Sequence, residues 1–470
     1  MTTAPQKIVI TGASGNVGTG VLRALTKALP GTGLVGICRR PPAARAAHDP
    51  VTWHAVDLSA CSAADDLAPA MQGADVVIHL ALALRPPDDE EYLSRVNVAG
   101  TDAVLTAMAT AGVRQLIYAS SLGVYAPGAT DPVTEDWPCT GQPTSSYSRD
   151  KVAAEKLVDE FAQSHPEVAV ARFRPTLVVQ RESAWEVQTL YLGPFVPRAL
   201  FGLLRRRGLP VVPLPAGIAL QFVHADDVGE AVVRMVQTRA TGAFNLAADI
   251  LDARALAGLI GGRPIAVNPR LVRGVVTALH AIHAVAVTPG WYDVAMNSPT
   301  MDISCARDEL GWSPTRSSTV NARELIDGLA DGAVGSSPAM GAIEDDRSGF
   351  RRTSDQIHDS SLLLWTTAAV LRAAGVGRAG LTDAAFIAAN VVGGTPAALE
   401  RLLARRRDPV ALLAPVAVVA SIATTIRGGW SSVASVAVLN LFAESERRRA
   451  KRPTEQHNSR GSGHVQLESN

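Results

Sequence analysis

Short apolar runs alternate with longer amphipathic stretches over residues 1–330. The runs that predict strands are Lys7–Thr11, Leu34–Cys38, Val51–Val56, Val76–Leu80, Gln115–Ala119 and Val168–Arg172. Apolar residues recur at helical spacing between them, most clearly in Val17–Ala28, Thr101–Ala111 and Lys151–Ser164. Because strands that alternate with helices form parallel sheets covered on both faces, the pattern predicts an α/β fold with a Rossmann-type, doubly wound parallel sheet.

The amino-acid composition of the chain changes after residue 330. Residues 331–360 are rich in Gly, Ser, Asp and Arg, which is typical of a flexible linker. Residues 361–446 are rich in Ala, Val and Leu and are interrupted by Gly and Pro, which predicts an all-helical C-terminal module. Residues 447–470 are basic and then polar, as in a disordered tail. We therefore expect one nucleotide-binding domain over residues 1–330, with a smaller substrate lobe at about 180–220 and 265–300.

An uncharged apolar run, Val410–Ile426, raises the question of membrane contact. A helix of this length reaches roughly 26 Å, which is short of a ~30 Å hydrocarbon core. A buried helix pair within a small bundle and a peripheral membrane contact through these helices both account for the run.

Composition excludes several classes of function. Lys plus Arg and Asp plus Glu both number 44, so no overall charge favours nucleic acid. The four cysteines stand singly with no metal-ligand spacing, which predicts buried thiols, a reducing compartment and no metal site. The polar N-terminus lacks the pattern of a secretory signal. We expect a cytoplasmic protein with a small-molecule substrate, and homodimer formation stays open.

A glycine-rich loop follows the first predicted strand and precedes a helix: Thr11-Gly12-Ala13-Ser14-Gly15-Asn16-Val17-Gly18. Gly12 permits a tight turn, Gly15 lets the backbone approach phosphate oxygens, and Gly18 allows close packing of helix and strand. The helix N-terminus offers unpaired N–H groups to an anion. This context predicts a dinucleotide site.

The end of the second strand bears on cofactor choice. A carboxylate there would accept the adenosine ribose hydroxyls, but the strand ends in Cys38-Arg39-Arg40. Guanidinium groups bind phosphate bidentately, so Arg39 and Arg40 favour NADP over NAD. Asp57 and Leu58, after the third strand, are expected beside the adenine.

Ser121, Tyr147 and Lys151 form the candidate catalytic set. Tyr147 and Lys151 are four residues apart in a helical stretch, so they share one face. A free tyrosine has a pKa near ~10, and an adjacent ammonium lowers it by stabilising the phenolate. Ser121 follows a buried strand at the sheet edge where ligands bind, and its hydroxyl can orient a substrate oxygen.

Together these residues resemble the extended short-chain dehydrogenase/reductases, which include the NAD-dependent epimerases and dehydratases. Further matching pieces, in the family's order, are His79-Leu80-Ala81, Asn97–Thr101, Ser120–Tyr125, Arg174-Pro175, Phe222–Val228 and Leu310–Pro314. The resemblance implies that Ser121, Tyr147 and Lys151 are catalytic and that Lys151 also holds the nicotinamide ribose. It implies cofactor contacts from the glycine loop, including Ser14, Asn16 and Val17, and from Leu80, Ala81, Ala119 and Pro175.

The chain also departs from the family pattern. After Arg174-Pro175 it lacks the Asn and Gly-Pro common in enzymes that act on nucleotide sugars, and its expected substrate lobe is apolar and aromatic. We therefore expect an oxidoreductase or epimerase-type enzyme that transfers hydride and a proton at a secondary alcohol or ketone. A nucleotide-sugar epimerase or dehydratase and a non-catalytic NAD(P)-binding sensor or scaffold are the alternatives.

Overall fold

The computed structural model describes residues 4–42, 51–84, 89–192, 198–281 and 285–342 of the 470-residue chain. Residues 1–345 form one compact unit. The predicted helical module at 361–446 and the tail at 447–470 lie outside the described residues. Within the described part, no helix is both long and apolar enough to cross a membrane.

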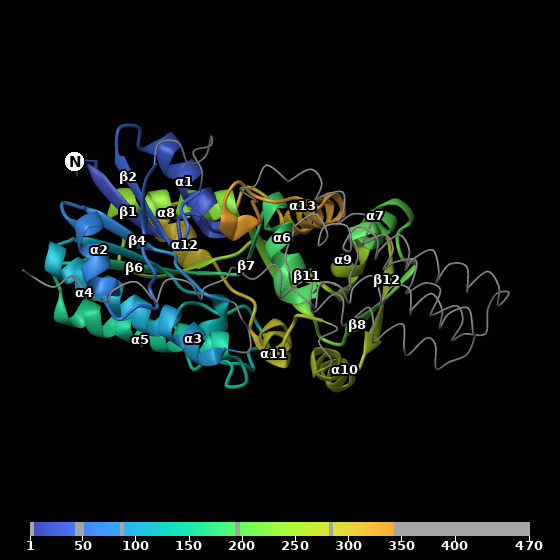
Figure 1. Cartoon of the computed structure of the whole chain (residues 1–470). Coiled ribbons are helices and arrows are strands. Elements are labelled where there is room, and N and C mark those ends of the chain that lie inside the picture. The colour runs from blue at the N-terminus through green and yellow to red at the C-terminus, as the bar shows by residue number, and fades with distance from the viewer. Residues whose placement is uncertain (1–3, 43–50, 85–88, 193–197, 282–284, 343–470) are drawn as a thin grey trace, which may run out of the picture. The chain divides into compact units, whose positions relative to one another are not determined.

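A seven-stranded parallel sheet forms the centre of this unit (Figure 1). The strand order is β10-β6-β5-β4-β1-β2-β3, so the chain starts in the middle and winds outward in both directions, as in a Rossmann-type sheet. The strands are β1 Lys7–Thr11, β2 Gly33–Cys38, β3 Val51–Ala55, β4 Val76–His79, β5 Gln115–Ala119, β6 Ala169–Pro175 and β10 Gly242–Leu246. The predicted doubly wound sheet is confirmed.

Helices cover both faces of the sheet, and each face has its own apolar core. On one face Ile8, Ile10 and Phe173 pack with the helices α1 (Asn16–Ala28), α8 (Ala225–Thr238) and α12 (Ser304–Leu310). On the other, Val9 and Val77 pack with α2 (Ala63–Met71), α4 (Gly100–Ala111) and α5 (Ser146–Ser164). Alternate residues of β1 therefore face opposite cores, as the pleat of a strand requires.

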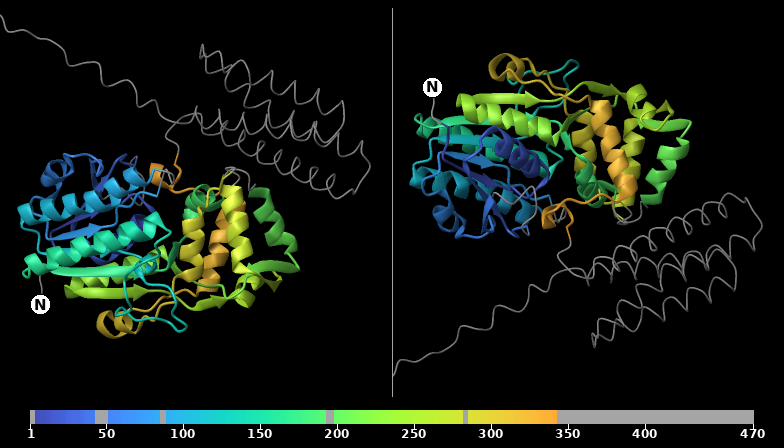
Figure 2. Two further views of the ribbon diagram at one scale, coloured as in Figure 1. Left: turned by 90° about the horizontal axis from the view of Figure 1, so that it is seen from below. Right: turned by 90° about the horizontal axis from the view of Figure 1, so that it is seen from above.

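A smaller lobe lies beside the sheet and is built from the green, yellow and orange parts of the chain (Figure 2). It contains a three-stranded sheet in the order β11-β9-β7 and a parallel pair, β12-β8. Its strands are β7 Leu177–Val179, β8 Val211–Pro215, β9 Ala219–His224, β11 Ile250–Asp252 and β12 Arg263–Val267. Its helices are α6 Ala184–Val187, α7 Arg198–Arg207, α9 Ala253–Gly258, α10 Pro269–Ala281, α11 Pro289–Asn297 and α13 Ser318–Asp331.

The structure differs from the sequence-based expectations in several details. Strand β6 extends to Pro175 rather than ending at Arg172, because it pairs along its length with β10, which the apolar pattern did not reveal. Residues 332–342, expected as the start of a linker, end in a short 3₁₀ turn, Pro338–Met340, in which Met340 is buried. Of the four cysteines, which were expected to be buried, Cys61 is exposed and the other three are half-buried.

Candidate active site

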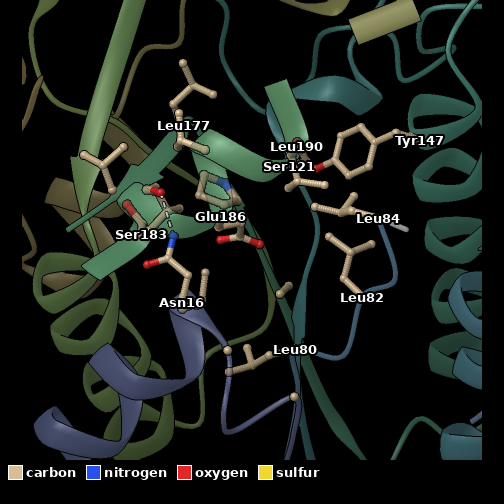
Figure 3. Close-up of a pocket in the computed structure, with 18 of the residues that line it drawn as sticks. Asn16, Leu80, Leu82, Leu84, Ser121, Tyr147, Leu177, Ser183, Glu186 and Leu190 are labelled. Atoms are coloured by element: carbon tan, nitrogen blue, oxygen red, sulfur yellow. Dashed lines mark hydrogen bonds between the residues drawn. The ribbon is translucent and has the colours of Figure 1, made fainter. Parts of the chain in front are cut away.

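One cavity of about 830 Å³ opens at the carboxyl ends of the sheet strands. Every residue predicted for the site lines it: Gly12, Ser14, Gly15, Asn16, Val17, Gly18, Arg39, Arg40, Asp57, Leu58, Leu80, Ala81, Ala119, Ser121, Tyr147, Lys151 and Pro175. Figure 3 shows part of this lining, with Asn16 and Leu80 at one end and Ser121 and Tyr147 at the other. The fold thus brings together residues from the ends of the six strands β1 to β6 and from the helices α1 and α5, and their roles in binding and catalysis stay predictions.

The glycine loop has the shape that a dinucleotide site needs. Gly12 adopts φ +70°, and a Cβ there would lie 2.7 Å from the backbone nitrogen of Ala81. A Cβ on Gly18 would lie 2.4 Å from the carbonyl oxygen of Gly12, so neither position accepts a side chain. Helix α1 has no side-chain cap and no acidic residue in its first turn, which leaves its N-terminus open to an anion.

Asn16 uses its side chain within the protein. Its Nδ2 donates to the carbonyl oxygen of Val178 at 2.8 Å, and its Oδ1 accepts from Gln180 Nε2 at 2.8 Å. These bonds tie the loop to β7 and to the residue that follows it. The contact with a cofactor that the family resemblance implies for Asn16 would therefore come from its backbone.

The end of the cavity expected for adenosine carries two cations. Arg39 and Arg40 follow β2, and Arg39 donates to the hydroxyl of Tyr92 with its guanidinium 5.9 Å from the centre of that ring. Asp57 Oδ1 accepts from the backbone nitrogen and the hydroxyl of Ser59 at 2.9 and 2.8 Å, which stabilises a turn. Tyr92 was not found from the sequence, because no motif marks it.

The three candidate catalytic residues come from two neighbouring elements. Ser121 follows β5, whereas Tyr147 and Lys151 lie in the first two turns of α5. The hydroxyl groups of Ser121 and Tyr147 face each other in Figure 3, and Ser121 Oγ accepts from the backbone nitrogen of Gly123 at 3.0 Å. Lys151 Nζ donates to the carbonyl oxygen of Ala119 at 2.6 Å and lies 5.1 Å from the centre of the Tyr118 ring.

Burial shifts both titrating groups of this set. It raises the pKa of Tyr147 to about 12, against the lowering effect of the hydrogen bond from Ser121. It lowers the pKa of Lys151 to about 8, against the raising effect of Glu155 and Asp150. The net shift of the Tyr147 pKa is upward because the cost of burying a phenolate dominates, and a lowering of this pKa by Lys151 stays a prediction.

Aromatic and aliphatic side chains surround the phenol of Tyr147. The ring of Trp291, from α11, stacks on it with 4.5 Å between centroids and 28° between planes, and Tyr191 meets Trp291 edge-on at 5.3 Å. Many of the other residues that line the cavity are apolar. They include Leu82, Leu84, Leu122, Leu177, Val187, Leu190, Leu220, Phe222, Val276, Val287, Val294 and Pro299. Sequence reasoning found this region apolar but missed the stacked pair, whose members are far apart in the chain.

Polar residues outside the positions expected for the cofactor also line the cavity, among them Glu186, Gln221, Thr176 and Ser298. The hydroxyls of Thr176 and Ser298 are buried with no hydrogen-bond partner in the described part of the chain. Among the described residues, the cations that line the cavity are Arg39, Arg40 and Lys151, all at positions expected for the cofactor. Arg205, near the end of α7, is not among the residues that line the cavity, and it pairs with Asp327 and Asp331.

The fold agrees with the comparisons with known proteins. Residues 8–247 match the model of the NAD dependent epimerase/dehydratase family, and the chain belongs to this family. UDP-glucose 4-epimerase of Streptomyces lividans is 28% identical over 233 residues, which cover 47% of this chain and 64% of that enzyme. The uncharacterized protein y4nG of Sinorhizobium fredii is 27% identical over 264 residues, covering 53% and 62%. The chain thus spans less than two thirds of the length of these curated relatives.

Solved structures share the fold at low sequence identity. The crystal structure of gox2253 superposes with a TM-score of 0.54 at 22% identity, covering 70% of this chain and 98% of that one. The dTDP-glucose 4,6-dehydratase DesIV from Streptomyces venezuelae, solved with NAD and TYD bound, gives 0.51 at 17% identity and covers 69% and 97%. The likeness establishes the architecture.

Proposed function

We propose that the protein is an NAD(P)-dependent oxidoreductase or epimerase-type enzyme that acts on a secondary alcohol or ketone through Ser121, Tyr147 and Lys151. The observation that carries the proposal is the single cavity that holds this set and the glycine loop together. A bound nicotinamide supplies hydride transfer. Tyr147 then gives its proton to the carbonyl oxygen of a ketone, or takes the hydroxyl proton of an alcohol.

The neighbours of Tyr147 have distinct tasks in this scheme. Ser121, whose hydroxyl faces the phenol, orients the substrate oxygen beside it. Lys151, once its hydrogen bond moves from Ala119 towards a bound ribose, brings its charge to the site and opposes the rise in the pKa of Tyr147. We place the diphosphate at the N-terminus of α1 and the adenosine phosphate of NADP at Arg39 and Arg40.

The lining supports a largely apolar, uncharged substrate. A nucleotide sugar would bring a diphosphate of its own. Outside the positions expected for the cofactor, the described residues that line the cavity include no lysine or arginine, and they include the acidic Glu186. Leu177 stands in the stretch after Arg174-Pro175 where the family pattern often has asparagine. The similarity to UDP-glucose 4-epimerase favours the alternative, a nucleotide-sugar epimerase or dehydratase.

A substrate panel tests the proposal. Purified protein is assayed with NAD(H) and NADP(H) against apolar secondary alcohols and ketones, and UDP-glucose is incubated in parallel. We expect turnover of apolar substrates, whereas conversion of UDP-glucose without turnover of the others would favour the alternative.

The Tyr147→Phe variant separates an enzyme from a sensor or scaffold. Removal of the phenolic hydroxyl should lower kcat by about 10²-fold or more and leave cofactor affinity unchanged. Tyr125→Phe makes the same chemical change outside the cavity, where the hydroxyl donates to Asn245 Oδ1 at 2.6 Å, and should retain turnover. Parent-like turnover by Tyr147→Phe would refute the catalytic assignment.

A further inference from the structure

The last described stretch of the chain, residues 335–341, is a self-contained loop that we call the C-terminal strap. The backbone nitrogen of Gly335 donates to Met340 O at 2.8 Å, that of Met340 to Ser337 O at 3.0 Å, and that of Ala342 to Ser337 O at 2.9 Å. Pro338 lies in the first turn of the 3₁₀ segment and restricts its backbone. The strap therefore has a defined shape.

The strap is attached to the glycine loop. Ser337 Oγ donates to the carbonyl oxygen of Ser14 at 2.5 Å, and the Ser337 side chain is completely buried. The hydroxyl of Thr19, in the first turns of α1, lies 3.7 Å from Met340 Sδ and also donates to Asn16 O at 2.9 Å. Both contacts join residues more than 320 positions apart, one on the glycine loop and one on the helix that follows it.

The same segment reaches the substrate lobe. Gly341 adopts φ +88°, and a Cβ there would lie 2.6 Å from Trp185 Cγ, so the strap backbone packs directly on the indole of α6. Pro338 and Ala339 line the cavity that Gly15 also lines. Figure 2 shows this orange end of the described chain at the junction between the blue sheet region and the green and yellow lobe.

We propose that the C-terminal strap is part of the dinucleotide site and retains the cofactor. The inference rests on the proposed function, since it requires a dinucleotide on the glycine loop. Pro338 and Ala339 then border the bound diphosphate, and Ser337 holds the Ser14 carbonyl so that the loop keeps its binding shape. No residue of the strap is charged, so it approaches the diphosphate without adding repulsion. Cofactor release requires the strap to move away from the loop.

The rate at which NADPH dissociates from the full-length protein tests whether the strap retains the cofactor. NADPH is displaced by excess NADP in a stopped-flow experiment and followed by its fluorescence. Ser337→Ala should raise the dissociation rate about fivefold, because it loses a hydrogen bond worth about 1 kcal/mol. Ser317→Ala is the matched control: Ser317 also caps a helical segment, accepting from Val320 N at 3.3 Å as Ser337 accepts from Met340 N at 3.3 Å, but it does not contact the glycine loop.

Hydrogen exchange provides a readout that does not depend on turnover. The amides of Gly335, Met340 and Ala342 should exchange several-fold more slowly when NADPH is added to the parent protein, because the strap opens less often when the site is filled. Circular dichroism checks that both variants are folded.

The possible outcomes distinguish a failure of the strap proposal from a failure of the proposed function. A raised dissociation rate in Ser337→Ala alone, with slower exchange on NADPH binding, supports the proposal. If the parent binds NADPH but Ser337→Ala releases it at the parent rate and strap exchange is unchanged, the strap has no role and the proposed function stands. If the parent binds neither NADPH nor NADH, the proposed function fails, and the strap proposal fails with it.

Discussion

The ammonium group of Lys151 is buried with 5% of the residue exposed, beside Tyr118 and the carbonyl of Ala119. In the protein without cofactor, this ammonium group donates a hydrogen bond to the backbone of β5 rather than to the phenol of Tyr147. In the proposed function, cofactor binding moves Lys151 away from Ala119 and so couples to the activation of Tyr147.

The pKa of Lys151 predicts a pH-dependent stability. Its pKa is about 8 in the folded protein and 10.5 in the unfolded chain, so between these values the unfolded chain binds more protons. The free energy of unfolding of the parent, relative to Lys151→Met, should therefore rise as pH increases from about 8 to 10.5 and stay constant below that window. Urea denaturation without cofactor at pH 7, 8, 9 and 10 measures it, and a difference that stays constant throughout would contradict the prediction.

Arg39 predicts the choice of cofactor. If it binds the adenosine phosphate, Arg39→Ala should raise the Kd for NADP about tenfold and leave that for NAD unchanged, since a hydrogen bond to a charged group contributes about 1.5–3 kcal/mol. Fluorescence titration with both reduced cofactors measures this. Arg95→Ala removes an exposed arginine that pairs with Glu91 and should change neither Kd. Unchanged NADP affinity in Arg39→Ala would remove the argument for NADP.

At the scale of elements, a buried ion pair joins helix α5 to strand β6 of the sheet. Arg174 of β6 donates from Nε to Glu155 Oε1 at 2.9 Å and from Nη2 to Oε2 at 2.7 Å, and both side chains are at most 6% exposed. Glu155 lies one turn beyond Lys151 in α5. The pair therefore sets the position of the helix that presents Tyr147 and Lys151.

Loss of one partner should be costly. Glu155→Gln leaves the Arg174 guanidinium buried without a countercharge, and we expect it to lower the free energy of unfolding by about 3 kcal/mol. Glu91→Gln makes the same change in an exposed pair, where Glu91 is 86% exposed, and should cost less than about 1 kcal/mol. Chemical denaturation of the parent, Glu155→Gln and Glu91→Gln measures the three free energies of unfolding. Equal values for the parent and Glu155→Gln would show that the buried ion pair contributes little to stability.

At this scale the sequence predicted some elements better than others. Strands β1 and β5 have the predicted bounds, because each is a buried apolar run between clear turn signals. Strand β10 was missed because Gly242–Leu246 contains a glycine and an asparagine, and its apolar residues find their partners only through pairing with β6.

At the scale of the whole molecule, the cavity belongs to one compact unit. The residues described as lining it run from Gly12 to Ala339, and the unit extends to residue 345. We predict that a fragment of residues 1–345 folds and binds NADPH with the affinity of the full chain. Thermal unfolding and fluorescence titration of the fragment test this, and a Kd weakened tenfold or more would assign a binding contribution to residues 346–470.

The sequence by itself determined the parallel sheet, the glycine loop between the first strand and its helix, and the placement of Tyr147 and Lys151 one turn apart on one helix. These features have local causes: the period of apolar residues, the steric need for glycine at fixed spacings, and the rise of one helical turn. Only the tertiary structure decided that Trp291 stacks on Tyr147, that Lys151 bonds to Ala119, and that Ser337 closes on Ser14. Contacts between distant residues depend on the path of the whole chain, and no short-range pattern encodes them.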